Sequence, residues 1–378
     1  MYGDQKTVAR LRSIKARRAI DTDPYESLQW LLPVPALFHL KMNWVGLIHR
    51  THFLEKYSKS PFSLAYTRDL LNRKRVNQYK SDFFALEEFV VHNFQGRIIA
   101  AIQSELKLET EMSFRQLLQA LTPEALDRAI NCVADRLFAT PLSEITDNEL
   151  YNHIHFLQMS LTYLTLKYAI KHGDLCLLRR AITKSCFYFG GSMQRNYAYE
   201  TLYLFHLTCG EASSPELQKA ILASGLINWR GKCDTWWEID REVEIHNGSM
   251  KKIIRDRRTP NMNLDHLFEY CALNSEFYKN LQISLYNRFG LRTNTTHPDK
   301  PASYDILTIA SHVYESMQPT HQGKSPYRVK DLLFAAAGKL GIAIHKFNQK
   351  ERLCFKTTEA EAYAENSALE NLFEWDDE

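Results

Sequence analysis

Three clusters of basic residues carry the clearest chemical signal in this sequence. They are Arg10 to Arg18, which includes Arg12 and Lys15, the run Arg73-Lys74-Arg75, and Lys251-Lys252 with Arg255, Arg257 and Arg258. Lysine and arginine side chains gathered in this way neutralise nucleic-acid phosphates. They are equally typical of ordinary solvated helix faces, so the clusters by themselves leave both interpretations open.

Other reactive side chains fit catalytic or metal-binding patterns poorly. His153 and His155 are two positions apart and point to different faces of a helix, which does not suit a shared metal ion. Gly190-Gly191-Ser192 follows no strand, so we expect a helix end and the cap of the next helix there, not a phosphate-binding loop. His39 is interpreted as a packed or capping residue at a helix start. No G-x-S-x-G pattern supports a Ser-His-Asp hydrolase.

The elements that must position these side chains are mostly helices. Apolar residues recur at three- and four-residue spacing between Phe83 and Leu106, which is the period of an amphipathic helix. Further helices are predicted at 7–19, 37–57, from Pro123, 147–172, 174–189, from Ser192, 215–224, 235–258, 264–288, 304–317 and 329–340. Trp236 and Trp237 are expected in the core. The carboxylates Glu238, Asp240, Glu242 and Glu244 make a charge run typical of a solvated helix face.

One segment, Leu28–Val34, is predicted to be a strand because it is a short and nearly continuous apolar run. Pro33 and Pro35 place it at a sheet edge, since proline cannot donate to a ladder. A strand needs a hydrogen-bonded partner. No neighbouring segment resembles one, so either Leu28–Val34 is extended without a sheet or its partners lie upstream of Met1.

Composition describes a globular protein of 378 residues, 45% hydrophobic and 24% charged, with a net charge of +3. That charge is too small to indicate nucleic-acid binding by itself. The seven cysteines include no C-x-x-C pair, so reduced thiols are expected. No apolar run reaches the roughly 18 residues of a membrane span, and the first residues lack a secretory apolar region. We expect an intracellular protein that makes no membrane contact, in the nucleus more than the cytoplasm.

Four sequence blocks resemble a known family. They run over Gly3–Arg10, Trp30–Met42, Phe189–Ala198 and Asp240–Asn247. Together they resemble a fungal, transposon-associated family built on domain of unknown function 6589. The order of its elements is in turn similar to that of transposases with a ribonuclease-H-like core.

The resemblance implies a mainly α fold: a large helical domain with a remnant of a ribonuclease-H-like α/β core, made of one edge strand plus helices. The implied regions are a partial core at 1–60, a helical insertion at 61–233, a helix returning to the core at 234–290, and a C-terminal helical region with an acidic tail at 291–378. The first four core strands and the first catalytic aspartate would then be absent.

The resemblance also assigns roles to residues. Asp4 and Glu244 would be the second and third carboxylates of a DDE-type DNA transposase, holding Mg²⁺ for phosphodiester cleavage. Arg10, Arg12 and Lys15 follow Asp4, and Lys251, Lys252 and Arg255 follow Glu244, so both groups would flank one site and bind DNA. The expected protein is transposon-derived, N-terminally incomplete and inactive alone. The alternative is a non-catalytic helical protein that binds nucleic acid or another protein.

Overall fold

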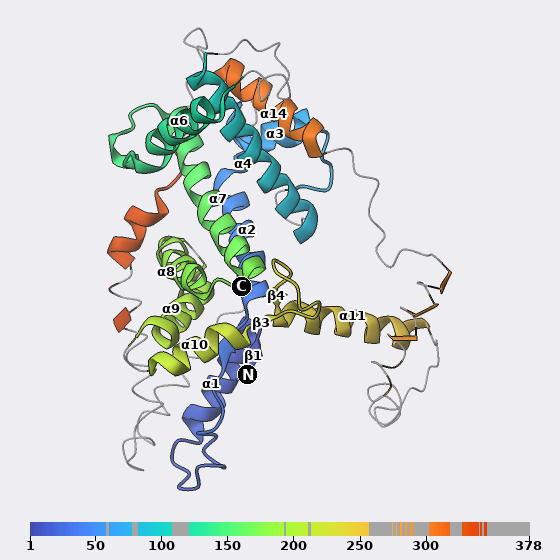
Figure 1. Ribbon diagram of the computed structural model, residues 1–378. Helices are drawn as coiled ribbons and strands as arrows, with labels where there is room; N and C mark the ends of the chain where they lie inside the picture. The colour runs from blue at the N-terminus through green and yellow to red at the C-terminus, as the bar shows by residue number, and fades with distance from the viewer. Residues whose placement is uncertain are drawn as a thin grey trace.

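The computed structural model describes residues 1–57, 60–77, 82–107, 121–192, 194–210, 213–256, 302–317 and 327–339, with isolated positions between 274 and 289 and at 341, 344 and 345. Side chains from 249 to 256 are excluded from that description. The predicted helix at 264–288 and the acidic tail therefore lie mainly outside the described residues. The described part of the chain is mainly helical, as the sequence predicted (Figure 1).

The N-terminal residues form a small parallel strand pair joined by a helix. Strand β1 is Tyr2–Gly3, helix α1 is Gln5–Arg17 and strand β2 is Val34–Pro35. Tyr2 pairs with Val34 and Gly3 with Pro35. The strand at β2 thus has its partner inside this chain, and the expectation of partners lying only upstream of Met1 is wrong.

Most of the predicted strand at Leu28–Val34 is also wrong. Residues 24–30 form turns, and Leu28 has a φ of 55°, a left-handed conformation that a continuous strand excludes. Only Val34 and the following Pro35 are extended and paired. Of this run, Leu32 and Val34 pack against the core while Trp30 in the turn is exposed, so the apolar run did not mark a buried strand.

The helical body is built around long helices that share one apolar core. Its main elements are α2 (Leu37–His52), α3 (Leu64–Leu70), α4 (Phe83–Glu105), α6 (Pro123–Ala134), α7 (Asn148–His172), α8 (Leu175–Gly191), α9 (Arg195–Cys209), α10 (Pro215–Ser224) and α14 (Ala302–Ser316). Short helical turns lie at Glu55–Tyr57, Asp135–Ala139 and Leu142–Glu144. Helix α2 packs against α4 and α7, and the buried core runs from Val34 to Leu332. The predicted boundary at residue 60 does not interrupt this core.

Helix ends follow the local signals that the sequence carries. Asp147 caps α7 by accepting a hydrogen bond from the Leu150 amide at 2.8 Å, and Gly173 ends the helix with a φ of 67°. Pro123 opens α6 as predicted. Ser192 was predicted to cap the next helix, and the structure differs in detail. Its hydroxyl accepts from the Gln194 amide at 3.0 Å, but α9 begins one residue after Gln194, which is the N-cap.

Helix α14 lies along α4 (Figure 1) at a contact that admits no side chain on Gly96. A Cβ atom on Gly96 would stand 2.7 Å from the Cβ of Ile309, far inside normal contact. Gly191, at the end of α8, is equally restricted because a Cβ there would overlap the backbone carbonyl of Leu332. The C-terminal segments are thus seated on the body through glycine contacts.

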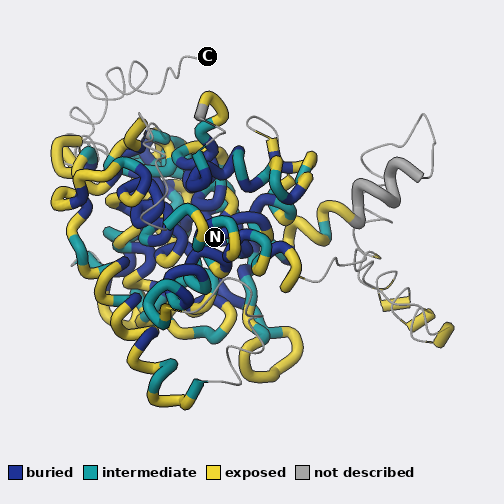
Figure 2. Tube along the Cα trace, turned by 90° about the horizontal axis from the view of Figure 1, so that it is seen from above, coloured by how far each residue is buried: buried dark blue, intermediate teal, exposed yellow. Residues whose placement is uncertain are grey.

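Strands β3 (Leu226–Ile227) and β4 (Trp237–Glu238) form an antiparallel pair that leads into helix α11 (Ile239–Asp256). The prediction of one helix from residue 235 was wrong at its start, because Trp237 belongs to β4 and Trp236 precedes it. Helix α11 contacts α2 and β1 at its beginning and then extends away from the body (Figure 1). From Val243 to Gly248 its residues are exposed, apart from the half-buried His246 (Figure 2).

Several histidines are buried in the interior without hydrogen-bond partners. His52, His153 and His155 are fully buried, and within the part of the chain that the structure describes neither ring nitrogen of any of them has a hydrogen-bond partner. His155 faces His52 with ring centroids 5.2 Å apart, whereas His153 packs on Phe62. The two histidines of α7 thus point to different neighbours, as their spacing predicted. No helix in the described part of the chain is long and apolar enough to cross a membrane.

Candidate functional site

Asp4 stands directly after β1 and begins α1. Its Oδ1 accepts a hydrogen bond from the Thr7 amide at 2.8 Å, so Asp4 is the N-cap of the helix. The hydrogen bond from Thr7 is the main reason that the pKa of Asp4 is lowered, and nearby His39 and Lys6 lower it further. Asp4 is therefore an ionised carboxylate held at the end of a strand.

His39 lies in the first turn of α2 and is held by a carboxylate from α11. Its Nδ1 is 3.0 Å from Oδ2 of Asp240. The same carboxylate accepts hydrogen bonds from the backbone amides of Phe38 at 3.0 Å and His39 at 3.2 Å. Because the N-cap residue of α2, Ala36, offers no side-chain bond, Asp240 caps this helix from 201 residues away.

Glu244 completes the cluster. Its Oε1 is 3.8 Å from Nε2 of His39, on the opposite side of the ring from Asp240, and its side chain is 47% exposed. The hydrogen bond to Asp240 is the largest cause of a raised pKa for His39, and the charges of Glu244 and Asp4 add to it. Asp4 and Glu244, far apart in sequence, thus lie close enough to act on the same imidazole. We call Asp4, His39, Asp240 and Glu244 the His39 cluster.

A small pocket adjoins this cluster. It is lined by Gly3 and Pro35 of the strand pair, by His39, and by Tyr197 and Thr201 of α9. Burial raises the pKa of Tyr197 to about 12, and the charges of Glu200, Asp4 and Asp240 contribute. The cavity of about 10 Å³ has room for about one water molecule.

The acidic run before Glu244 is not a solvated helix face, so that expectation is corrected. Glu238, Asp240 and Glu242 are buried, and only Glu244 is exposed. Glu238 forms a close ion pair with buried Lys41, with Nζ and Oε1 2.7 Å apart, although the approach is not aligned as a hydrogen bond. The run is buried because the start of α11 packs on α2.

The predicted DNA-binding residues divide into internal and external ones. Arg12 forms a bidentate ion pair with Glu200, with Nη1 and Oε2 3.0 Å apart, and its guanidinium lies over the rings of Tyr199 and Tyr203. This buried pair ties α1 to α9 and does not present Arg12 to a phosphate. Lys15 donates to the carbonyl of Leu31, while Arg10 is exposed.

The second basic group lies on the outer half of α11. Lys251, Lys252 and Arg255 fall within this helix, which places them beyond Glu244 on the part that leaves the body. Their side chains lie outside the described residues. The sequence prediction that they flank Glu244 on one helix agrees with the backbone.

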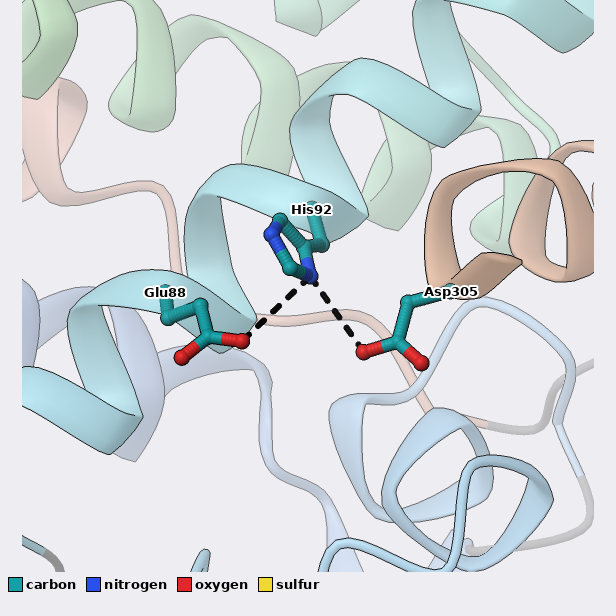
Figure 3. Close-up of side chains that lie close together, drawn as sticks. All are labelled: Glu88, His92 and Asp305. Atoms are coloured by element: carbon teal, nitrogen blue, oxygen red, sulfur yellow. Dashed lines mark hydrogen bonds and ion pairs between the residues drawn. The ribbon is translucent and has the colours of Figure 1, made fainter. Parts of the chain in front are cut away.

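A second cluster of histidine and carboxylates joins α4 to α14 (Figure 3). His92 Nδ1 is 3.3 Å from Oδ2 of Asp305 and 4.0 Å from Oε1 of Glu88. In the described residues, only Glu88, His92 and Asp305 bring ligand atoms of three such side chains within 4.8 Å of one another. The guanidinium of Arg73 binds both Asp305 and Glu88. The positive charge that these two carboxylates require is therefore supplied by an arginine of the protein.

Sequence reasoning missed His39 and Asp240 as site residues. His39 was interpreted as a packed or capping residue, and Asp240 as part of a solvated run. The available signal was their position: both lie inside the sequence blocks at Trp30–Met42 and Asp240–Asn247 that carry the family resemblance. Which residues face one another across 201 positions is visible only in the fold.

The comparisons with known proteins identify the family and no relative of known activity. The model of the family of unknown function DUF6589 matches residues 1–297, so the chain belongs to that family. No match is found among curated proteins, and none among solved structures.

Proposed function

We propose that this member of the DUF6589 family binds DNA and takes part in metal-dependent phosphodiester chemistry at the His39 cluster, as a transposon-derived protein with a ribonuclease-H-like arrangement. The observation that carries the proposal is that Glu244 lies 3.8 Å from the His39 imidazole, whose pKa the charge of Asp4 also raises. Fungal origin and a nuclear location belong to the same proposal.

The topology around Asp4 supports it. Strands β1 and β2 are parallel and are connected through α1, and Asp4 follows β1 at its carboxyl end. Ligands of open α/β sheets bind outside the carboxyl ends of the strands. Helix α11 contacts β1 and carries Glu244, so Glu244 belongs to the same end of the strand pair as Asp4.

The two carboxylates Asp4 and Glu244 are oxygen donors of the kind that Mg²⁺ prefers, but they are only two protein ligands. Mg²⁺ prefers oxygen ligands and is commonly held by one or two carboxylates together with substrate phosphates and water. Asp4 and Glu244 would hold it here, and Asp4 retains an oxygen that the Thr7 bond does not use. When bound, Mg²⁺ would activate an attacking oxygen and stabilise a leaving one. Asp240 orients His39, and exposed Arg10 is placed to neutralise a phosphate.

The test is Mg²⁺-dependent cleavage or strand transfer on end-labelled duplex DNA. From the sequence we expect this chain to be inactive alone; any activity that it does show should fall at least about tenfold in Asp4→Asn and in Glu244→Gln. Asparagine caps a helix as well as aspartate does, so Asp4→Asn keeps α1. Asp127→Asn, an exposed carboxylate on α6, is the matched control and should leave activity unchanged. Equal activity in all variants would remove Asp4 and Glu244 from the proposal.

A non-catalytic DNA-binding protein is the second candidate, favoured by the shape of α11. Its outer half leaves the body (Figure 1), and Lys251, Lys252 and Arg255 fall within this helix by sequence. If no cleavage occurs but affinity falls with salt and the triple alanine variant of these residues reduces the salt slope, this function is supported. Unchanged affinity in that variant excludes the α11 surface.

A further inference from the structure

We propose that His39 is a nitrogen ligand of the cation at the His39 cluster, so that this site selects a divalent transition-metal ion such as Mn²⁺ over Mg²⁺. The inference rests on the proposed function only for the place of the cation. It adds a ligand and a metal class that two carboxylates alone would not provide.

The first argument is the way His39 is held. A histidine that binds a metal usually gives its other ring nitrogen to a carboxylate, which fixes the tautomer and the ring orientation. Asp240 does this at Nδ1, at 3.0 Å, and is itself fixed by the amides of Phe38 and His39. The ring therefore presents Nε2 as the nitrogen available to a ligand.

The second argument is the position of Glu244. Two ligand atoms that each lie about 2.0–2.2 Å from a metal ion can be up to about 4 Å apart. Nε2 of His39 and Oε1 of Glu244 are 3.8 Å apart, within that span. Both side chains reach toward solvent, since His39 is 23% and Glu244 47% exposed, so an ion has access to them. In the described residues the ligand atoms of Asp4, His39 and Glu244 do not all lie within 4.8 Å of one another, so Asp4 would contribute only through water.

The third argument is charge. In the part of the chain that the structure describes, the ion pairs of Asp240 and Glu244 are made with His39 alone. Two carboxylates thus contact one imidazole, and the charge of Asp4, itself influenced by Lys6, adds to theirs. The cluster at Glu88, where Arg73 takes the place of a cation, is the opposite case.

The metal class follows from the donors. Carboxylate and water suit Mg²⁺ and Mn²⁺, whereas imidazole suits transition metals and is a poor ligand for Mg²⁺. A mixed set of one imidazole nitrogen and carboxylate oxygens therefore favours Mn²⁺ over Mg²⁺ at equal concentration.

The experiment measures Mn²⁺ binding to the full chain without DNA, by the loss of the free-ion electron paramagnetic resonance signal. We expect one site that Mg²⁺ displaces only at more than about tenfold excess. His39→Gln should abolish it, and Asp240→Asn should weaken it about 10–100-fold. His246→Gln is the matched control, because His246 lies on the same helix as Glu244 and is paired with Glu242.

Two outcomes would overturn the inference: Mn²⁺ binding that His39→Gln leaves unchanged, or equal competition by Mg²⁺. Circular dichroism checks that each variant folds, and Glu244→Gln, at an exposed side chain, gives a second test if His39→Gln does not fold. Unchanged binding in Glu244→Gln contradicts the inference equally. Binding that depends on His39 in a protein that cleaves no DNA would uphold the metal site and reject the catalytic part of the proposed function.

Discussion

His39 contacts two carboxylates of α11, and His92 lies between a carboxylate of its own helix α4 and one of α14, but among the described residues only the cluster at His92 contains a guanidinium. Arg73 binds Glu88 and Asp305, so the His92 cluster holds α14 to α4 as a neutralised ion-pair network. The His39 cluster is open to solvent at Glu244 and has no such arginine among its ion pairs in the described residues. Similar residue types thus make a structural ion-pair network between α4 and α14 in one place and a candidate ligand site in the other.

Acid is expected to have the largest effect, because it separates these carboxylate-bound histidines from those of the interior. Burial lowers the pKa of His49 and of His155 to about 4, and holds the pKa of His52 and His153 well below the usual value. Below about pH 6.5 the unfolded chain therefore binds more protons than the folded one, and stability falls.

The expected loss is about 2 kcal/mol for each of His49 and His155 at pH 5, and His52 and His153 act in the same direction. His39, whose pKa is raised, acts in the opposite sense: its stabilisation is complete below the unfolded pKa and is lost as pH rises. Thermal unfolding between pH 7.5 and 5 measures the balance. His155→Leu should make the dependence shallower, and an unfolding temperature that does not change with pH would contradict the prediction.

Removing the arginine tests the comparison most directly. Arg73→Ala leaves the buried Asp305 without its cation, and we expect a loss of about 3 kcal/mol in urea unfolding, at the low end for a broken buried pair because Arg73 is partly exposed. The vacated cluster should then bind Zn²⁺, which would raise the unfolding midpoint of the variant and not of the wild type. Arg75→Ala, at an exposed neighbour, should stay within about 0.5 kcal/mol.

Gly96→Ala tests whether the ion-pair network between α4 and α14 depends on close packing of these two helices. The added methyl group would stand 2.7 Å from the Cβ of Ile309, so α14 must shift, and we expect a loss of about 1–3 kcal/mol. Gly248→Ala is the control, because a Cβ there meets nothing within 4 Å. Equal stability of the two variants would show that α14 is seated less closely than described.

Asp240→Asn should give the smallest change in stability. Asparagine can still accept from one of the Phe38 and His39 amides, but its NH2 group cannot accept from the other and the charge at the start of α2 is lost, at a cost of about 1 kcal/mol. The pKa of His39 should fall, as followed by its ring proton shifts in NMR. A His39 pKa that does not move would show that Asp240 does not hold the ring.

Much of the helical body was predictable, since its signals are local. The cap at Asp147, the proline at the start of α6 and the glycine after α7 mark helix ends within a few residues. The strand prediction failed because the backbone of residues 24–30 forms turns. An apolar run does not require an extended chain. The site was predictable only in part. Asp4 and Glu244 were singled out through the family resemblance, whereas the pairing of His39 with Asp240 was not.

The sequence by itself therefore determined the helices and their caps, because period and capping act over a few neighbouring residues. The two outer carboxylates of the His39 cluster came from the family resemblance. The tertiary structure decided which charges are buried, which are neutralised and which remain open. Arg12 turns inward to Glu200, Arg73 closes one cluster, and Asp240 reaches α2 across 201 residues. Those outcomes depend on which helices pack together, and no local pattern contains that information.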